Sequence, residues 1–144
     1  MNLRLPFVVC SLAVGLSGEA AAQACNHQQS IPVLSTLLQN NTVCAALAPD
    51  RWQEYHAPGG ALFDWKRGPG HPVDPREQVG TWSISSVTVG GNTRELVTHR
   101  YTGGGSYTYR VCLTAPTTYT FQQVSPASIT ITGATIPAGS VACP

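Results

Sequence analysis

A run of aromatic and acidic side chains in the first half of the chain is the part best suited to chemistry. Trp52, Glu54 and His56 alternate along one predicted strand, so their side chains share one face of a sheet. If the glycine-rich turn that follows has an even length, Phe63 and Trp65 of the next strand join that face. Turned inward, such a face predicts a ligand cavity with aromatic walls and a few polar groups. Aromatic residues on a strand are, however, more often part of a filled core.

The acid and the histidine in this set suggest a reaction as well as a binding site. Burial of Glu54 beside His56 would raise the pKa of its carboxyl group and make it a candidate general acid or base. No nucleophile, acid or base has a partner at a diagnostic spacing, so we assign no catalytic residue and favour binding. The predicted ligand-binding residues are Trp52, Glu54, His56, Phe63, Trp65 and Trp82.

The other histidines give no metal motif. His99 alternates with Val97 and Tyr101 on an apolar strand face, which predicts a hydrogen-bonded core histidine. The sequence has no H-x-x-x-H, H-x-H or C-x-x-C spacing, so we predict neither a metal site nor a cofactor.

A proline- and glycine-rich segment, Arg67 to Gln78, differs from every other connection in the chain. Its three prolines, two glycines and mixed charges exclude a helix or a ladder strand. Loops of this length are often lids or binding loops, although a solvated excursion without a partner is equally consistent. The residues of this predicted protein-binding loop are Arg67, His71, Asp74 and Arg76.

The N-terminus has the pattern of a Sec-type signal peptide. Arg4 precedes an almost wholly apolar run from Leu5 to Leu16, and small residues follow. We predict cleavage after Ala24, with Ala22 as the alternative, and a periplasmic or secreted protein. Lipidation of Cys25 is disfavoured because the residues before it lack a lipobox. The apolar run is too short for a comfortable membrane span, and no later segment approaches the required length.

The cysteine count changes when the leader is removed. Cys10 is lost, and an even set of four remains, which favours two disulfides in an exported chain. Four cysteines allow three pairings. We favour Cys25 with Cys44 and Cys112 with Cys143, and the alternative joins the outer pair, Cys25 and Cys143, and the inner pair.

Charge excludes some partners. Without Arg4 and Glu19, the eight basic and seven acidic residues become seven and six, a balance that argues against nucleic acid or an anionic membrane as the main partner.

Hydrophobic periodicity predicts an all-β fold in one domain, residues 25–144, after a leader of residues 1–24. Apolar residues from Ile31 to Leu38 have helical spacing, so we expect one short helix ended by Asn40-Asn41. The rest alternates with period two and has frequent glycine turns, which predicts a small antiparallel meander closing into a barrel or a sandwich. The predicted strands are Thr42–Leu47, Arg51–His56, Leu62–Lys66, Gly80–Val89, Glu95–Tyr101, Ser106–Leu113, Thr118–Gln123 and Ser128–Gly133.

Several sequence motifs carry a resemblance that spans Ile31 to about Phe121. The motifs are Leu37–Val43, Trp52–Gly60, Val79–Ile84 and Ser106–Val111. They are similar to small exported bacterial proteins of uncharacterised function, and the resemblance implies a lipocalin-like or calycin-like β-barrel without assigned catalytic residues. The long proline-rich loop and the threonine-rich stretch after Phe121 depart from that pattern.

Three functions follow as hypotheses. The leading one is an exported, non-enzymatic, monomeric protein that binds a small apolar or aromatic ligand. One alternative is a protein-binding module, such as an inhibitor of a secreted hydrolase, that uses the segment 67–78. The other is a hydrolase or isomerase that uses Glu54 and His56.

Overall fold

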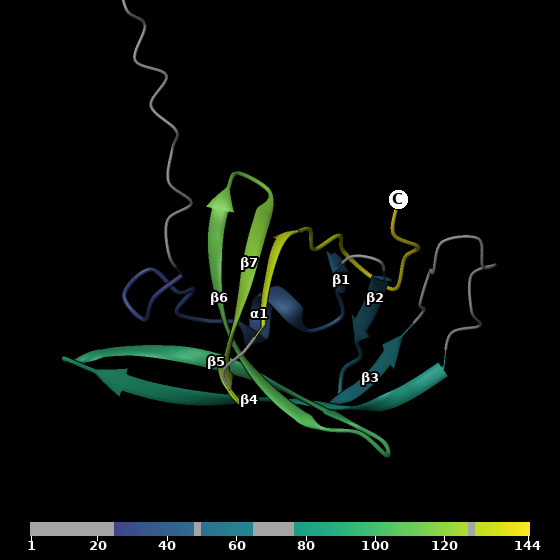
Figure 1. Cartoon of the computed structure of the whole chain (residues 1–144), viewed down its shortest axis with the longest axis horizontal. Coiled ribbons are helices and arrows are strands. Elements are labelled where there is room, and N and C mark those ends of the chain that lie inside the picture. The colour runs from purple at the N-terminus through teal and green to yellow at the C-terminus, as the bar shows by residue number, and fades with distance from the viewer. Residues whose placement is uncertain (1–24, 48–49, 65–76, 127–128) are drawn as a thin grey trace, which may run out of the picture.

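The structure is a computed structural model that describes residues 25–47, 50–64, 77–126 and 129–144. It contains one short helix, α1 (Ser35–Leu38), and eight strands (Figure 1). Each predicted strand has a counterpart, with ends that differ by a few residues. The strands are β1 (Thr42–Leu47), β2 (Asp50–His56), β3 (Ala61–Asp64), β4 (Glu77–Val89), β5 (Asn92–Tyr101), β6 (Ser106–Ala115), β7 (Thr118–Ser125) and β8 (Thr130–Ala134).

The eight strands form one antiparallel sheet that curls into a nearly closed barrel. Each strand pairs with its sequence neighbour, in the order β1 to β8. The two ends of the sheet meet at Cys44 and Thr135, where the Cys44 amide donates to the Thr135 carbonyl at 2.8 Å and the Thr135 amide donates back at 2.9 Å. The predicted all-β meander that closes into a barrel is therefore confirmed.

The core lies between α1 and the inward side chains of the later strands. Leu34 and Leu38 are fully buried beside Val97 of β5 and Val111 of β6. The start of α1 is fixed by Glu95, whose Oε2 accepts hydrogen bonds from the amides of Leu34 at 2.6 Å and Ser35 at 2.8 Å. The helix is shorter than predicted. It ends before Asn40, which has a φ of 61° and turns the chain into β1.

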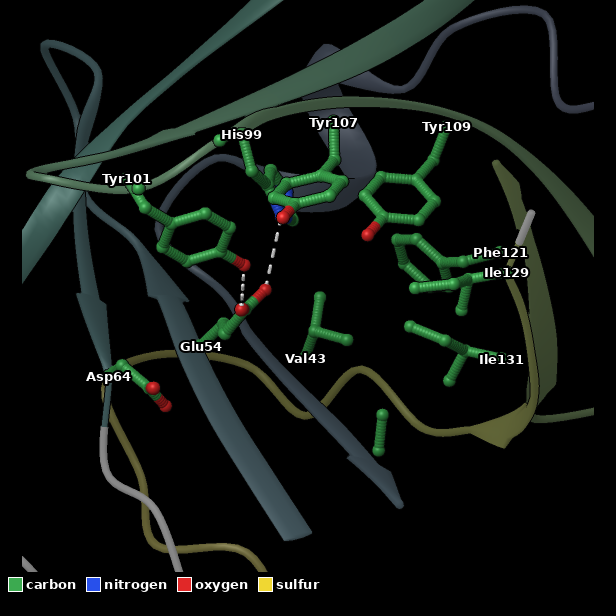
Figure 2. Close-up of a pocket in the computed structure, with 13 residues that line it drawn as sticks. Val43, Glu54, Asp64, His99, Tyr101, Tyr107, Tyr109, Phe121, Ile129 and Ile131 are labelled. Carbon is green, nitrogen blue, oxygen red and sulfur yellow. Dashed lines mark hydrogen bonds and ion pairs between the residues drawn. The ribbon is translucent and has the colours of Figure 1, made fainter. Parts of the chain in front are cut away.

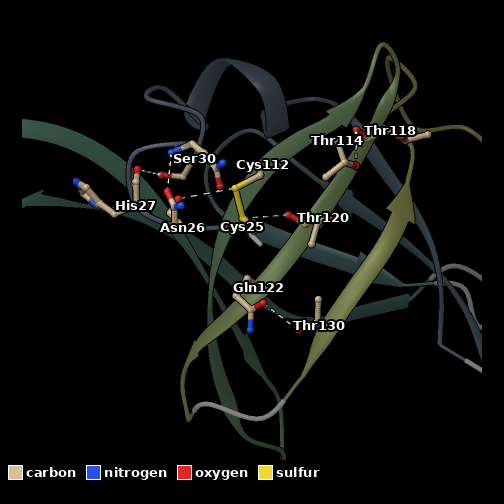
Figure 3. Close-up of a disulfide and its surroundings, with 11 residues drawn as sticks. Cys25, Asn26, His27, Ser30, Cys112, Thr114, Thr118, Thr120, Gln122 and Thr130 are labelled. Atoms are coloured by element: carbon tan, nitrogen blue, oxygen red, sulfur yellow. Dashed lines mark hydrogen bonds between the residues drawn. A yellow bond between two sulfur atoms is a disulfide. The ribbon is translucent and has the colours of Figure 1, made fainter. Parts of the chain in front are cut away.

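The disulfides join Cys25 to Cys112 and Cys44 to Cys143, so the pairing that we favoured is wrong, and so is its alternative. Barrel closure explains both bonds. The N-terminal segment crosses β6 at a bridge between Ser30 and Cys112, which places Cys25 beside that strand (Figure 3). The segment after β8 runs along β1 and carries Cys143 to Cys44.

Two further predictions concern the proline-rich segment and the membrane. The exclusion of strand from 67–78 is wrong at its end, because Glu77 and Gln78 pair with β3 as the first residues of β4. Residues 67–76 lie outside the described residues, as does the predicted leader, residues 1–24. Within the described ranges, no helix has the length and apolar character needed to cross a membrane.

Candidate functional site

The barrel contains a partly open cavity of about 320 Å³ (Figure 2). Its walls are mostly aromatic and aliphatic, with two carboxylates and one histidine among them. The lining residues are Val43, Ala45, Glu54, Asp64, His99, Tyr101, Gly104, Gly105, Tyr107, Tyr109, Phe121, Ile129 and Ile131.

Strand alternation positions these side chains. On β5, His99 and Tyr101 are two residues apart and face inward, and on β6 Tyr107 and Tyr109 do the same. His99 lies directly opposite Tyr107 in the register of the two strands. Glu54 reaches the same space from β2, across the barrel from β5. The site therefore depends on the closure of the barrel.

Glu54 contacts the two polar side chains nearest to it in the cavity, those of His99 and Tyr101 (Figure 2). Its Oε2 lies 3.1 Å from His99 Nδ1, and its Oε1 accepts a short hydrogen bond from the Tyr101 hydroxyl. Burial alone raises the pKa of this carboxyl, but attraction to His99 and hydrogen bonds from His99 and Tyr101 outweigh burial and lower it to about 2. The predicted rise in the pKa of Glu54 is wrong, because its partners come from a distant strand.

The series of hydrogen-bonded side chains continues from His99 to His56. The Nε2 atoms of the two rings are 3.0 Å apart, and His56 Nδ1 is 3.2 Å from the Glu54 carbonyl oxygen. A carbonyl only accepts, so His56 donates through Nδ1 and its Nε2 carries a lone pair. The bond to His99 then requires a proton on His99 Nε2.

Burial agrees with this proton assignment. His56 is 0% exposed, and His99 is 2% exposed. Burial first, and then the neighbouring His99, lower the pKa of His56 to about 3, so His56 is neutral at physiological pH.

Two tyrosine hydroxyls in the cavity stay protonated. Burial and the Glu54 carboxylate strongly raise the pKa of Tyr101. The same two causes, in that order, raise the pKa of Tyr109 to about 12. Both side chains therefore present neutral phenols at physiological pH.

The structure brings together only part of the predicted ligand-binding set. Glu54 lines the cavity, whereas His56 lies behind His99 and Trp82 packs edge-on against His56, with ring centroids 5.2 Å apart. The Trp82 indole donates to the Ala57 carbonyl at 3.0 Å. Neither His56 nor Trp82 is among the residues that line the cavity.

Phe63 lies on the other face of the sheet from Glu54. Five residues separate His56 from its partner Leu62, so the turn has an odd length and Glu54 is opposite Asp64. Phe63 instead pairs with Tyr55, and their ring centroids are 6.3 Å apart. The predicted shared face is wrong in this respect. The Trp52 side chain, Trp65 and the loop residues Arg67, His71, Asp74 and Arg76 lie outside what the structure describes.

Sequence reasoning missed most of the cavity wall. Asp64, Tyr101, Tyr107, Tyr109 and Phe121 were not in the predicted set, although the period-two spacing of the tyrosines was a usable signal. His99 is the hydrogen-bonded, buried histidine that its pattern predicts, and it also lines the cavity.

The described residues contain no group of three or more histidine, cysteine or acidic side chains arranged to hold a metal ion. Comparison of the chain with protein-family models, with curated proteins and with solved structures found no match.

Proposed function

We propose that this protein is an exported binding protein that holds a small ligand with an apolar or aromatic body inside its barrel. The observation that carries the proposal is the cavity of about 320 Å³, with aromatic and aliphatic walls and a few polar groups at one end. Small-molecule sites are usually preformed concave spaces with this composition, and cavities of this size suit compact ligands.

The electrostatics of the site favour binding over catalysis. A general base works best when its pKa is near the operating pH. The pKa values of Glu54 and His56 are lowered to about 2 and about 3, so both groups are weak bases. His56 is also fully buried and does not line the cavity. The hydrolase or isomerase hypothesis therefore draws no support from this geometry.

Export is part of the proposal because of the cysteines and the leader-like N-terminus. Two disulfides are compatible with an oxidising environment outside the cytoplasm. The alternative of a protein-binding loop concerns residues outside the described ranges, so no observation favours it.

The test is isothermal titration calorimetry of the purified protein against a panel of small aromatic and aliphatic compounds. We expect saturable one-to-one binding by some of them. Ile129→Trp, which fills the cavity, should abolish that binding, whereas Leu113→Trp, at a position 54% exposed, should leave it unchanged. Circular dichroism checks that both variants fold. Binding that survives in a folded Ile129→Trp protein would place the ligand elsewhere and refute the proposal.

A further inference from the structure

A tyrosine hydroxyl lies among apolar side chains in the cavity wall. Tyr109 belongs to the same cluster of buried residues as Phe121 and Ile131. Its side chain is 6% exposed, and its ring packs against those of His99 and Phe121 at centroid distances of 5.5 and 6.2 Å. Figure 2 shows that its hydroxyl points into the cavity.

This hydroxyl has no hydrogen-bond partner among the described residues. Tyr101, in the same wall, differs because its hydroxyl donates to Glu54. Buried hydroxyls normally have a partner, which Tyr109 can take only from solvent or from a ligand. A ligand that covers the Tyr109 hydroxyl displaces solvent from it, so the ligand must replace that hydrogen bond or lose affinity.

The chemistry of a phenol favours a ligand atom that accepts this hydrogen bond. A phenol hydroxyl can donate and accept. It is the better donor, because the ring withdraws electron density from its oxygen. Tyr101 uses its hydroxyl in this way towards Glu54. The ligand atom that best matches Tyr109 is therefore an acceptor.

Glu54 favours an uncharged acceptor. Burial first, and then the charge of Glu54, raise the pKa of Tyr109, which means that both oppose a negative charge on its oxygen. They oppose a negative charge on a ligand oxygen beside it for the same reasons. An ammonium group, in turn, has no lone pair to accept the Tyr109 proton. A neutral acceptor fits this position better than either ion.

The rest of the wall near Tyr109 fits an apolar body. Phe121, Ile129 and Ile131 line the cavity on this side (Figure 2). Contact with these side chains would supply affinity by burying apolar surface, and the hydrogen bond to Tyr109 would fix the orientation of the ligand.

We propose that the cavity binds an uncharged carbonyl compound, whose oxygen accepts a hydrogen bond from Tyr109 and whose ring or chain packs against Phe121 and Ile129. This inference rests on the proposed binding function and names the chemical class of the ligand. A carbonyl oxygen has two lone pairs and no proton, so it matches a donor that has no partner in the protein.

The experiment compares ligands of one shape that differ in one group, by calorimetry at pH 7. The probes are acetophenone, isopropenylbenzene and benzoate, together with the corresponding naphthalene compounds. The ketone offers a neutral acceptor, the alkene offers none, and the carboxylate offers a charged one. The alkene is the more hydrophobic of the first two, so the quantity to follow is the ratio of ketone affinity to alkene affinity.

Variants show whether Tyr109 is the donor. Tyr109→Phe should lower the ratio about three- to tenfold, the effect of one hydrogen bond. The matched control is Tyr119→Phe, which makes the same change at a tyrosine that does not line the cavity and should leave the ratio unchanged. In the native protein, the carboxylate should bind more weakly than the ketone.

The outcomes separate this inference from the binding function. An unchanged ratio in Tyr109→Phe, or a carboxylate that binds more tightly than its ketone, would overturn the carbonyl inference and leave the binding function intact. Binding confined to compounds without an acceptor atom would do the same. If neither these probes nor the wider panel binds, the binding function itself fails.

Urea unfolding of Tyr109→Phe gives a further check that needs no ligand. The substitution removes a buried hydroxyl that has no partner in the described part of the protein, so the midpoint should stay unchanged or rise. A lower midpoint would show that the hydroxyl is bonded within the protein, and it would overturn the inference.

Discussion

Acid should destabilise this protein through His56, and the size of the effect follows from its burial. The folded pKa of His56 is about 3, compared with 6.5 for an unperturbed histidine. Because the folded pKa is depressed, the unfolded chain binds more protons, so this contribution to stability is present above pH 6.5 and is lost as the pH falls towards 3. Between pH 7.5 and pH 5, the linkage relation gives a loss of about 2 kcal/mol from this one group.

The measurement is urea unfolding at pH 7.5 and pH 5 of the native protein and of His56→Gln. Glutamine can still donate to the Glu54 carbonyl and accept from His99, so the variant keeps the hydrogen bonds and removes only the titrating ring. We expect the native protein to lose about 2 kcal/mol more than the variant between the two pH values. An equal pH dependence would refute the assignment of a neutral, buried His56.

Three further substitutions test the remaining interactions by urea unfolding at pH 7. Glu54→Gln should cost less than about 1.5 kcal/mol, because the amide can accept from Tyr101 and donate to His99 Nδ1, whereas Glu54→Leu leaves both side chains without this hydrogen-bond partner and should cost about 3–5 kcal/mol; equal losses would contradict these hydrogen bonds. Replacing both Cys44 and Cys143 by serine opens a link between residues 99 positions apart and should cost up to about 5 kcal/mol, so an unchanged midpoint would argue against this pairing. Glu95→Ala removes the acceptor of two amide hydrogen bonds at α1 and should cost about 1–2 kcal/mol; no loss would show that water replaces it.

Local patterns in the sequence were sufficient to predict the strands, but not to predict which side chains of neighbouring strands share a face of the sheet. Alternation of apolar residues depends only on the pleat, so every strand was found from its own residues. The shared face of Glu54 and Phe63 depended instead on whether the turn between them has an odd or an even length. Adding or removing one residue in such a turn moves every side chain beyond it to the opposite face of the sheet. No feature of Pro58-Gly59-Gly60 specifies how many residues the turn contains. The same limit applies to the disulfides, because the pairing of Cys44 with Cys143 requires β1 to meet the chain after β8.

The error about Glu54 shows how closure determines the chemistry of the site. From the sequence, burial was the only influence on its carboxyl that could be foreseen, and burial raises a carboxyl pKa. Closure brings His99 and Tyr101 to it from β5, and their hydrogen bonds and charge reverse the sign. A carboxylate fixed in its ionised form is a poor proton acceptor but a permanent negative charge. The partners that closure brings to Glu54 therefore weaken the case for catalysis by this residue.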